Sequence, residues 1–452
     1  MISTAFVLLA AIHGAVAAQT TGSFSVLSYN VAGLPDIISS GNPSVNTPLI
    51  AARLGPYNII NVQEDFNYHA ALYAGDKHAH RTPTSGGAGI GSGLNTLSDF
   101  EYVDFERVGW KDCNLNGGDC LTPKGFTFLR TRVSEGLWVD IYNLHTDAGS
   151  DSGDITARGK NFAQLTSYIA SNSAGFPVVV MGDTNGRYTR SGDSETLRSF
   201  LSNTGTTDAW VSSIRKGSFP AAGSNALVCG APFPAGTSQT DVDACEVVDK
   251  VFFRGGPTAS FLSGTYSNDH YAFIDSAGLP LSDHYPILSR IDWRLSSSLR
   301  LGDTTGGPHG TTFTDITGIL ADSVPKITTI TIRGANRLDA VSITSRTTSG
   351  STVTSTRGGT GGTAVTLTLG TSERITSTVA CSAQYNGRTR VFYLKVTTNQ
   401  GRSIEAGKTT SSCVTNNVPS DAGSPGAWGL VGFWGRAGDE VDRLAPIWGA
   451  AY

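Results

Sequence analysis

The pattern of hydrophobic residues changes near residue 300, and this change constrains the fold more than any other feature of the chain. Between residues 24 and 293, short apolar runs rich in β-branched residues alternate with amphipathic stretches, among them SFSVLSYNV, YNIINVQE, LWVDIYNLHT and FPVVVMGDTN. From Thr156 to Ala170 the apolar residues recur at helical spacing, and Thr156 is a candidate N-cap. Strands interleaved with helices predict an α/β domain.

From about Leu301 onward the helical signal disappears. Strand-like pieces such as KITTITIRG, LDAVSITSR, TAVTLTLG and RVFYLKVTTN are separated by glycine-rich turns, which predicts an all-β domain. The segment Ser296–Gly310 is expected to be the linker and first loop, with the linker itself at about 296–306. We therefore divide the chain into a domain at 20–295 and a domain at 296–452.

The N-terminus, MISTAFVLLAAIHGAVAAQT, has the form of a secretory signal peptide. An apolar run from Ala5 to Ile12 precedes small residues that end at Ala18, so we expect residues 1–18 to be removed. The absence of Lys and Arg at the start is a departure from the usual pattern. An N-terminal anchor helix is the alternative, but the run is too short to span a bilayer. We expect a secreted, extracellular protein.

The cysteines are consistent with export, because disulfides form in oxidising compartments. Six cysteines allow many connectivities, and we favour the three pairs that are local in sequence. No CxxC motif or Cys/His cluster suggests zinc. The expected pairs are Cys113 with Cys120, Cys229 with Cys245, and Cys381 with Cys413.

The formal net charge is −4, so the chain has no overall positive field that would attract nucleic acid. This weakens the hypothesis of a nuclease without excluding it, because metal ions bound in a site can supply local positive charge.

In the first part of the chain, polar residues stand at the ends of the apolar runs, where α/β sheets place their sites. Taken singly, Asn30 and Asp183 could cap turns, and His145 could be a core histidine. The positions are Asn30 after VLSY, Glu64 after INVQ, His145 after IYNL, Asp183 and Asn185 after VVVMG, Asp249 before KVFF, and Asp283 and His284 in LSDHYP.

The segments SYNVAGLP, VQE, NLHTD, GDTN, DKVFF and SDHYP resemble, in order, the successive motifs of the endonuclease/exonuclease/phosphatase superfamily. Each motif is weak alone, but six in the same order over residues 24–290 are a strong signal. The resemblance implies a mixed α/β (α+β) fold, a two-sheet, four-layer sandwich, that hydrolyses phosphoric diesters with the help of a metal ion.

The resemblance also implies a Mg²⁺ site, with Mn²⁺ as the alternative ion. Glu64 would be the principal ligand, Asn30 would lie beside it, and Asp283 would lie next to this metal or a second one. A hard cation held by one or two carboxylates, with waters retained, neutralises the phosphoryl group.

The remaining roles follow from the same resemblance. His284 would be the general base, with Asp249 fixing its tautomer, which keeps a histidine useful near neutral pH. Asp183 would orient the attacking water, and Asn185 would bind a phosphate oxygen. His145 would stabilise the phosphoryl oxygens or protonate the leaving group.

Superfamily membership does not determine the substrate. The segments CNLNGGDCLTPKGF and TARGKNFAQL resemble the neutral secreted sphingomyelinases, which implies a phospholipid substrate and peripheral membrane contact. Lys124 would then contact phosphate, unless it is only an exposed strand residue. An extracellular nuclease acting on nucleic acid is the second hypothesis, and an inositol-phosphate or other phosphoesterase is the third.

One departure from those sphingomyelinases concerns the membrane. Their acidic and aromatic membrane-contact hairpin is not evident here. A Gly/Pro/Ala-rich insertion from Trp210 to Thr240 contains Phe219 and Phe233 instead. It could contact lipid or be a long surface loop, and we favour the surface loop.

Residues 296–452 resemble a jacalin-related lectin domain, an all-β β-prism of three four-stranded sheets. The resemblance rests on GGPHGTTFTD, ITTITIRGANRLDAVSIT, RGGTGGTAVTLTLGTSERIT, YLKVTTNQGR and above all LVGFWGRAGDEVDRLAPIW. It implies binding to cell-surface or cell-wall glycans of the mannose or galactose type.

The last of these segments carries the sugar-binding Gly-x-x-x-Asp pattern of that family, from Gly438 to Asp442. By resemblance, the Asp442 carboxylate would accept hydrogen bonds from sugar hydroxyls, and the backbone N–H groups of Asp439 and Glu440 would donate to the sugar. Gly307 would complete the pocket. The alternative is a β-prism that has lost sugar binding, because Gly and Asp also serve turn geometry. Glu440 leaves the sugar preference open.

The sequence therefore predicts a secreted phosphodiesterase, sphingomyelinase-like in its substrate, that a carbohydrate-binding domain delivers to glycan-bearing surfaces. The alternative from a different class is a glycan-binding lectin whose α/β domain is a non-catalytic scaffold.

Overall fold

The structure is a computed structural model that describes residues 19–39, 41–224, 227–230, 232–234, 236–321, 325–419 and 427–451. The expected signal peptide, residues 1–18, lies outside the described residues. Within them, no helix is both long and apolar enough to cross a membrane.

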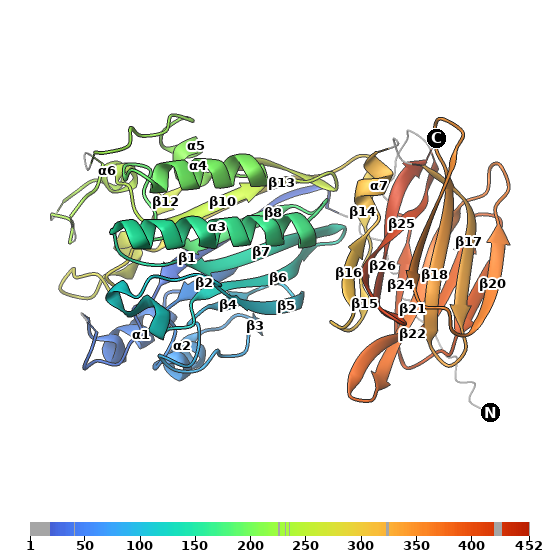
Figure 1. Cartoon of the computed structure of the whole chain (residues 1–452), viewed down its shortest axis with the longest axis horizontal. Coiled ribbons are helices and arrows are strands. Elements are labelled where there is room, and N and C mark those ends of the chain that lie inside the picture. The colour runs from blue at the N-terminus through green and yellow to red at the C-terminus, as the bar shows by residue number, and fades with distance from the viewer. Residues whose placement is uncertain are drawn as a thin grey trace, which may run out of the picture.

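The first domain contains two sheets that pack face to face (Figure 1). The first sheet has the order β11 (Ala259–Gly264), β13 (Ile287–Leu295), β1 (Thr21–Asn30), β2 (Ile59–Gln63), β4 (Asn95–Ser98), β3 (His80–Arg81), and β12 (Ser267–Asn268) also pairs with β13. The second has the order β5 (Tyr102–Gly109), β6 (Gly125–Ser134), β7 (Leu137–His145), β8 (Val178–Asp183), β10 (Asp249–Arg254), β9 (Thr207–Asp208). The pairs β1–β2 and β7–β8 are parallel, and the other pairs are antiparallel.

Helices cover the outer faces of both sheets. The long helices α3 (Ser152–Asn172) and α4 (Asp193–Thr204) lie on the second sheet, and α1 (Pro43–Ala51) and α2 (His69–Gly75) lie on the first (Figure 1). The result is the expected two-sheet, four-layer sandwich. The remaining short elements are η1 (Asn116–Leu121), α5 (Ala209–Ser213), α6 (Gln239–Ala244) and η2 (His270–Phe273).

The helix α3 begins earlier than the sequence suggested. Asp151 is its N-cap, and its backbone N–H donates to the Asp154 carboxylate at 2.9 Å in a capping box. Thr156 lies inside the first turns, and its hydroxyl donates to the Ser152 carbonyl at 2.7 Å. The expectation that Thr156 caps this helix was wrong, because the two aspartates satisfy the helix terminus first.

Alternation along β1 explains how this strand joins two cores. Phe24 and Val26 face the core between the sheets, whereas Leu27 and Tyr29 face the core under α1 and α2. Asn30 lies on the same face as Val26, so at its end the strand places a polar side chain on the face toward the second sheet. The buried strand thus delivers an amide to the edge of the sandwich.

Amide side chains connect the two sheets close to this edge. Gln63 donates to Asn143 at 2.8 Å, and Asn143 donates to the Val62 carbonyl at 2.9 Å. Asn61 donates to the Tyr142 carbonyl at 3.0 Å. All of these groups are buried. Hydrogen bonds in buried surroundings are strong, so they fix the ends of β2 and β7 relative to each other.

The second domain is all-β, as expected, and its three sheets surround one core (Figure 1). The first sheet has the order β14 (Leu299–Leu301), β26 (Val441–Ala451), β25 (Ala427–Ala437), β16 (Thr311–Thr314), and β15 (Thr305–Gly306) pairs with β26. The second has the order β19 (Thr352–Gly358), β18 (Leu338–Arg346), β17 (Lys326–Gly334), β20 (Thr363–Thr368). The third has the order β23 (Ser403–Gly407), β22 (Arg388–Thr398), β21 (Ile375–Tyr385), β24 (Ser412–Asn417). The short helix α7 is Ile316–Leu320.

The segment expected to be a linker differs from that expectation. Leu299–Leu301 and Thr305–Gly306 both pair with β26, so five of the residues 296–306 belong to a sheet of the second domain. The connection between the domains is consequently short.

The two domains pack against each other through a buried apolar cluster. Trp138 and Phe176 of the first domain contact Trp434 of β25, with ring centroids 5.3 and 5.6 Å apart. Arg436 and Arg443 of the second domain form ion pairs with the buried Asp104. Trp138 lies at the start of β7, so this interface is at the opposite end of the sandwich from the carboxyl ends of the central strands.

The three expected disulfides are confirmed. They join Cys113 to Cys120, Cys229 to Cys245, and Cys381 to Cys413.

Candidate functional site

The strand ends of the sandwich bring the sequence-predicted residues together. In the register of the sheets, Asp183 lies opposite His145 on one side and Asp249 on the other. Asn30 ends β1 beside the end of β2, which Glu64 follows directly. Residues separated by more than two hundred positions therefore meet at one edge.

Glu64, Asn30 and Asp183 form a compact group of polar side chains. The Asn30 amide donates to Glu64 at 3.0 Å and to Asp183 at 3.2 Å. Burial raises the pKa of Glu64, and the nearby Asp183 charge raises it further. Glu64 also has φ +55°, a backbone conformation that glycine favours, so its side chain is held there by the surrounding structure.

This group fits a hard divalent cation. Glu64 and Asp183 present carboxylate oxygens, the ligands that Mg²⁺ prefers, and the two repelling carboxylates share the NH2 of one neutral amide, Asn30, whose oxygen accepts the Ala32 N–H at 3.0 Å. A divalent charge beside them would offset that repulsion. The expected ligands Glu64 and Asn30 are thus adjacent, whereas Asp283 is exposed and lies at the rim, beside a pocket lined by Ala32 and Asn46.

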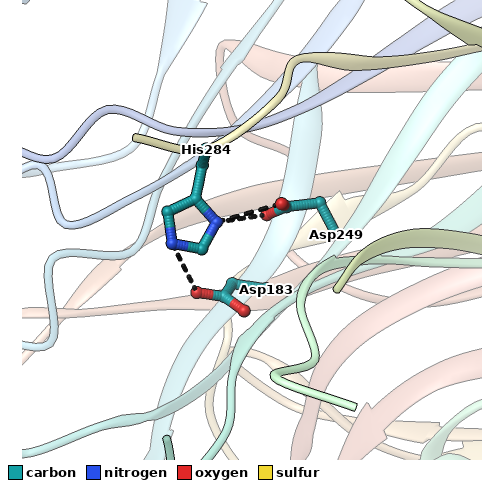
Figure 2. Close-up of side chains that lie close together, drawn as sticks. All are labelled: Asp183, Asp249 and His284. Carbon is teal, nitrogen blue, oxygen red and sulfur yellow. Dashed lines mark hydrogen bonds and ion pairs between the residues drawn. The ribbon is translucent and has the colours of Figure 1, made fainter. Parts of the chain in front are cut away.

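His284 lies between two aspartates (Figure 2). Its Nδ1 is 3.0 Å from Asp249 Oδ2, and its Nε2 is 3.6 Å from Asp183 Oδ2. Burial by itself would lower the pKa of His284, but the charges of Asp249 and Asp183 raise it well above the usual value. A cation bound at Glu64 would counteract the rise in the pKa of His284, because its positive charge would offset the negative charges of the two aspartates.

Asp183, Asp249 and His284 are also close enough to share a metal ion, since their ligand atoms all lie within 4.8 Å of one another. We assign them to proton transfer instead. The Nδ1 atom of His284 is already engaged by Asp249, which leaves Nε2 as the atom that faces Asp183. A carboxylate that holds one ring nitrogen is the arrangement of an oriented base.

His145 is neutral in this site. Its Nε2 is 3.3 Å from Asp183 Oδ2, and burial together with the Lys124 charge lowers its pKa to about 3. Its Nδ1 is buried without a hydrogen-bond partner among the described groups. A neutral imidazole can donate a hydrogen bond to a phosphoryl oxygen, and this favours the first of the two expected roles over protonation of a leaving group.

Lys124 and Asn185 converge on the same backbone carbonyl. The Asn185 amide donates to the Thr146 carbonyl at 3.2 Å, and the Lys124 ammonium lies 3.4 Å from it. Lys124 is mostly buried and pairs with Asp119. It is therefore not an exposed strand residue, and its charge acts on the site.

Three supporting residues were not predicted from the sequence. The Ser282 hydroxyl donates to the Asn30 carbonyl at 2.7 Å and accepts a hydrogen bond from the backbone N–H of His284 at 3.2 Å. Ser282 therefore connects the backbone of His284 to β1. Trp110 donates to the His145 carbonyl at 2.7 Å, and Thr146 donates to the Thr184 carbonyl at 2.6 Å. Ser282 could have been suspected from its place in the SDH motif, but Trp110 carried no local signal.

The long insertion packs onto the domain. Phe219 lies against Tyr188 and Phe233 lies against Tyr285, with ring centroids 5.2 and 5.3 Å apart. Both aromatic side chains are thus engaged with the protein, as expected for a surface loop.

The second domain brings its predicted sugar-binding residues together. Gly307 donates to the Asp442 carbonyl at 2.8 Å, and Gly310 has φ +70° with its α-carbon facing Asp442. A Cβ at Gly310 would come within 2.5 Å of Asp442 Oδ2, so glycine is required there. The carboxylate of Asp442 is buried, and its Oδ1 pairs with Arg390.

Two arginines in this region were missed. Arg390 occupies one oxygen of Asp442, and Arg337 pairs with Glu440 at 2.9 Å while stacking on the Tyr385 ring. The turn itself is closed by the Gly438 N–H, which donates to the Glu440 carbonyl at 2.9 Å, and the Asp439 carbonyl faces Gly359. Neither arginine is near the Gly-x-x-x-Asp motif in sequence, so no pattern could reveal it.

Family models match both halves of the chain. Residues 44–226 match the endonuclease/exonuclease/phosphatase family 2, and residues 303–446 match the jacalin-like lectin domain.

Curated relatives match a little over half of the chain. Proteins named sphingomyelinase from Mycobacterium bovis and Mycobacterium tuberculosis are 39% identical over 275 residues, which is 59% of this chain and 52% of each relative. The chain therefore spans about half the length of the curated relatives that it matches.

Solved structures are similar to each half. Sphingomyelinase C from Streptomyces griseocarneus is 20% identical, with a TM-score of 0.42 over 60% of this chain and 99% of that structure. AcmJRL, a mannose-binding jacalin-related lectin from Ananas comosus, is 23% identical, with a TM-score of 0.29 over 34% of this chain and 99% of that structure. By the family models, the chain thus contains a stretch similar to the endonuclease/exonuclease/phosphatase family at residues 44–226 and a jacalin-like lectin stretch at residues 303–446.

Proposed function

We propose that this protein is a secreted, Mg²⁺-dependent phosphodiesterase that acts on phospholipids of the sphingomyelin class. The observation that carries the proposal is the group of Glu64, Asn30 and Asp183 beside the Asp249–His284 pair. It unites an oxygen-rich cation site with an oriented base. The name of the mycobacterial relatives supports the choice of phospholipid.

The chemistry is attack of water on phosphorus, with loss of the alcohol oxygen as leaving group. Mg²⁺, held by Glu64 and Asn30, would supply charge neutralisation at the phosphoryl oxygens. His284 accepts a proton from the attacking water at Nε2, while Asp249 holds the opposite ring nitrogen and stabilises the imidazolium that forms. Asp183 accepts the second hydrogen bond of that water and so directs its lone pair at phosphorus.

Three donors line the side toward β7. Neutral His145 and the Asn185 amide are suited to hydrogen-bond the phosphoryl oxygens, and the Lys124 charge favours an anionic substrate. All three act in largely buried surroundings, where such electrostatic interactions are stronger than in water.

The lectin domain would concentrate the enzyme at glycan-bearing surfaces. Binding to a cell-surface or cell-wall glycan of the mannose or galactose type raises the effective concentration of substrate without changing the chemistry. The Asp442 site, with one carboxylate oxygen still facing Gly310, is the part of the domain that we expect to bind the sugar.

The first test is phosphoester turnover by the purified protein in Mg²⁺ and in EDTA. The substrates are sphingomyelin, lysophospholipids, plasmid DNA and inositol phosphates. We expect EDTA-sensitive release of phosphocholine from sphingomyelin. Nicked plasmid would transfer the assignment to a nuclease, and silence on every substrate would leave a glycan-binding protein with a scaffold domain.

A further inference from the structure

The most exposed aliphatic side chains of the described residues gather at one end of the molecule. Single exposed hydrophobic residues are normal on soluble proteins and need no explanation. Here, however, the five large apolar side chains that exceed 60% exposure all lie on three loops next to the candidate active site. They are Ile37 at 93%, Ile38 at 65%, Ile90 at 80%, Leu115 at 81% and Leu121 at 77%.

Two of these loops flank the segment that carries Glu64. The loop with Ile37 and Ile38 follows β1, and Gly33 in it donates to the Glu64 carbonyl at 3.0 Å. The loop with Ile90 returns to the same segment, since the Asp65 N–H donates to the Gly93 carbonyl at 2.9 Å. Their apolar tips therefore project from the walls of the cation site.

The third loop lies on the opposite wall. Leu115 lies within the segment closed by the Cys113–Cys120 disulfide, and Leu121 follows it directly. The Asn114 N–H donates to Asp147 at 2.7 Å, close to the end of β7. A fourth loop carries Leu279, exposed to 52%, and lines a pocket together with the loop after β1. Apolar tips thus stand on several sides of the catalytic group.

We propose that these loop tips, which we call the apolar rim (Ile37, Ile38, Ile90, Leu115, Leu121 and Leu279), insert into the interface of a phospholipid bilayer. This inference rests on the proposed function and names the partner surface of that site.

Three observations favour a bilayer over another occupant. Loops that carry the rim are hydrogen-bonded to the segment of Glu64 and to Asp147 after β7, so insertion would bring the candidate site close to the lipid headgroups. The tips are aliphatic and come from separate loops, which suits a fluid partner that has no fixed shape to match. The lectin domain packs against the end of the sandwich at Trp138, and the rim side chains stay exposed in the presence of both domains. Amphipathic surfaces of this kind enter the headgroup region by about 5–10 Å.

The test is flotation of the full chain with vesicles of phosphatidylcholine and sphingomyelin, which carry no glycan for the lectin domain. EDTA is present so that the lipid stays intact. We expect Ile90→Asp, Leu115→Asp and the double variant Ile37→Asp/Ile38→Asp each to weaken partitioning by about tenfold or more, the effect of losing one buried aliphatic side chain.

The chain offers a matched control. Leu262 on β11 is exposed to 52%, the same as Leu279, but it lies at the bulge opposite Asp292, away from the start of β13 and the site. Leu262→Asp should leave vesicle partitioning within twofold of the unchanged chain, whereas Leu279→Asp should weaken it. Equal behaviour of the two variants would overturn the proposal.

The remaining outcomes separate this inference from the proposed function. Turnover of a soluble phosphodiester such as bis(p-nitrophenyl) phosphate should be unchanged by the rim variants. Flotation that depends on the rim, without any phosphodiester turnover, would contradict the proposed function and support insertion of the apolar rim. Turnover without rim-dependent flotation would contradict insertion of the apolar rim. Oligomers in solution that dissociate in the rim variants, with flotation unaffected, would assign the rim to a second copy of this chain.

Discussion

Trp434 of the second domain packs edge-on against Trp138 of the first domain, with 5.3 Å between their ring centroids. Both indoles are almost fully buried, and the Arg130 guanidinium lies 5.2 Å from the Trp434 ring. The contact joins strands from two domains that share no sheet. The second domain is thus docked onto the first domain and not suspended from it by a flexible linker.

We therefore expect the two domains to unfold together. Trp434→Ala should remove about 3–5 kcal/mol, the usual cost of truncating a buried tryptophan, and should split a single calorimetric transition into two. Trp428→Ala, in the lectin core on the same strand, should destabilise that domain without uncoupling the pair. Two independent transitions in the unchanged protein would contradict this prediction.

Acid should destabilise the protein through His145. Its pKa is lowered to about 3 in the folded chain, so below pH 6.5 the unfolded chain takes up a proton that the folded chain refuses. The free energy of unfolding should fall by about 1.4 kcal/mol per pH unit from this residue as pH drops from 6 to 4. His145→Gln should remove that contribution in urea denaturation. Parallel pH profiles for both proteins would disprove the buried neutral state.

The base and its partner can be tested separately from the metal. Asp249→Asn should lower kcat by about 10²- to 10⁴-fold, because His284 loses the charge that orients it and stabilises its protonated form. The Mg²⁺ concentration for half-maximal turnover should not change. Asp292→Asn, on the exposed side of β13, is the control.

The cation site is tested by Glu64→Gln, which keeps the shape of the side chain and removes its charge. We expect turnover to require at least tenfold more Mg²⁺, since a carboxylate ligand is lost. An unchanged Mg²⁺ requirement in Glu64→Gln, together with a raised requirement in Asp249→Asn, would indicate that the metal binds to Asp183, Asp249 and His284 instead.

The sugar site depends on one carboxylate and one glycine. Asp442→Ala should abolish binding of the full chain to mannose- and galactose-type glycans on an array. Gly310→Ala should do the same without unfolding the domain, because its Cβ would displace Asp442 Oδ2. Gly318→Ala, in α7 of the same domain, has open space for a Cβ and serves as the control. Binding that survives both Asp442→Ala and Gly310→Ala would place the sugar elsewhere.

Much of the architecture could be predicted from the sequence, because strand and helix patterns are local. The division near residue 300 and the alternation along β1 follow from residues that are neighbours in the chain. The start of α3 was misplaced because Asp151 and Asp154 satisfy the helix terminus before Thr156 can, and both kinds of residue are plausible caps.

The candidate site, too, could be predicted from the sequence only in part. Ordered motifs pointed to Glu64, Asp183 and His284, but the neutral state of His145 depends on burial that no motif records. Arg390 reaches Asp442 from another sheet, so only the packed β-prism reveals that the carboxylate is already paired.

By itself, the sequence determined which side chains could perform the chemistry and which segments form strands, because these properties reside in each residue and its near neighbours. Only the tertiary structure decided that the lectin domain docks at one end of the sandwich while the catalytic group and the exposed aliphatic loops share the other. The reason is physical: docking and exposure depend on which surfaces remain after the core is packed, and that is a property of the whole chain.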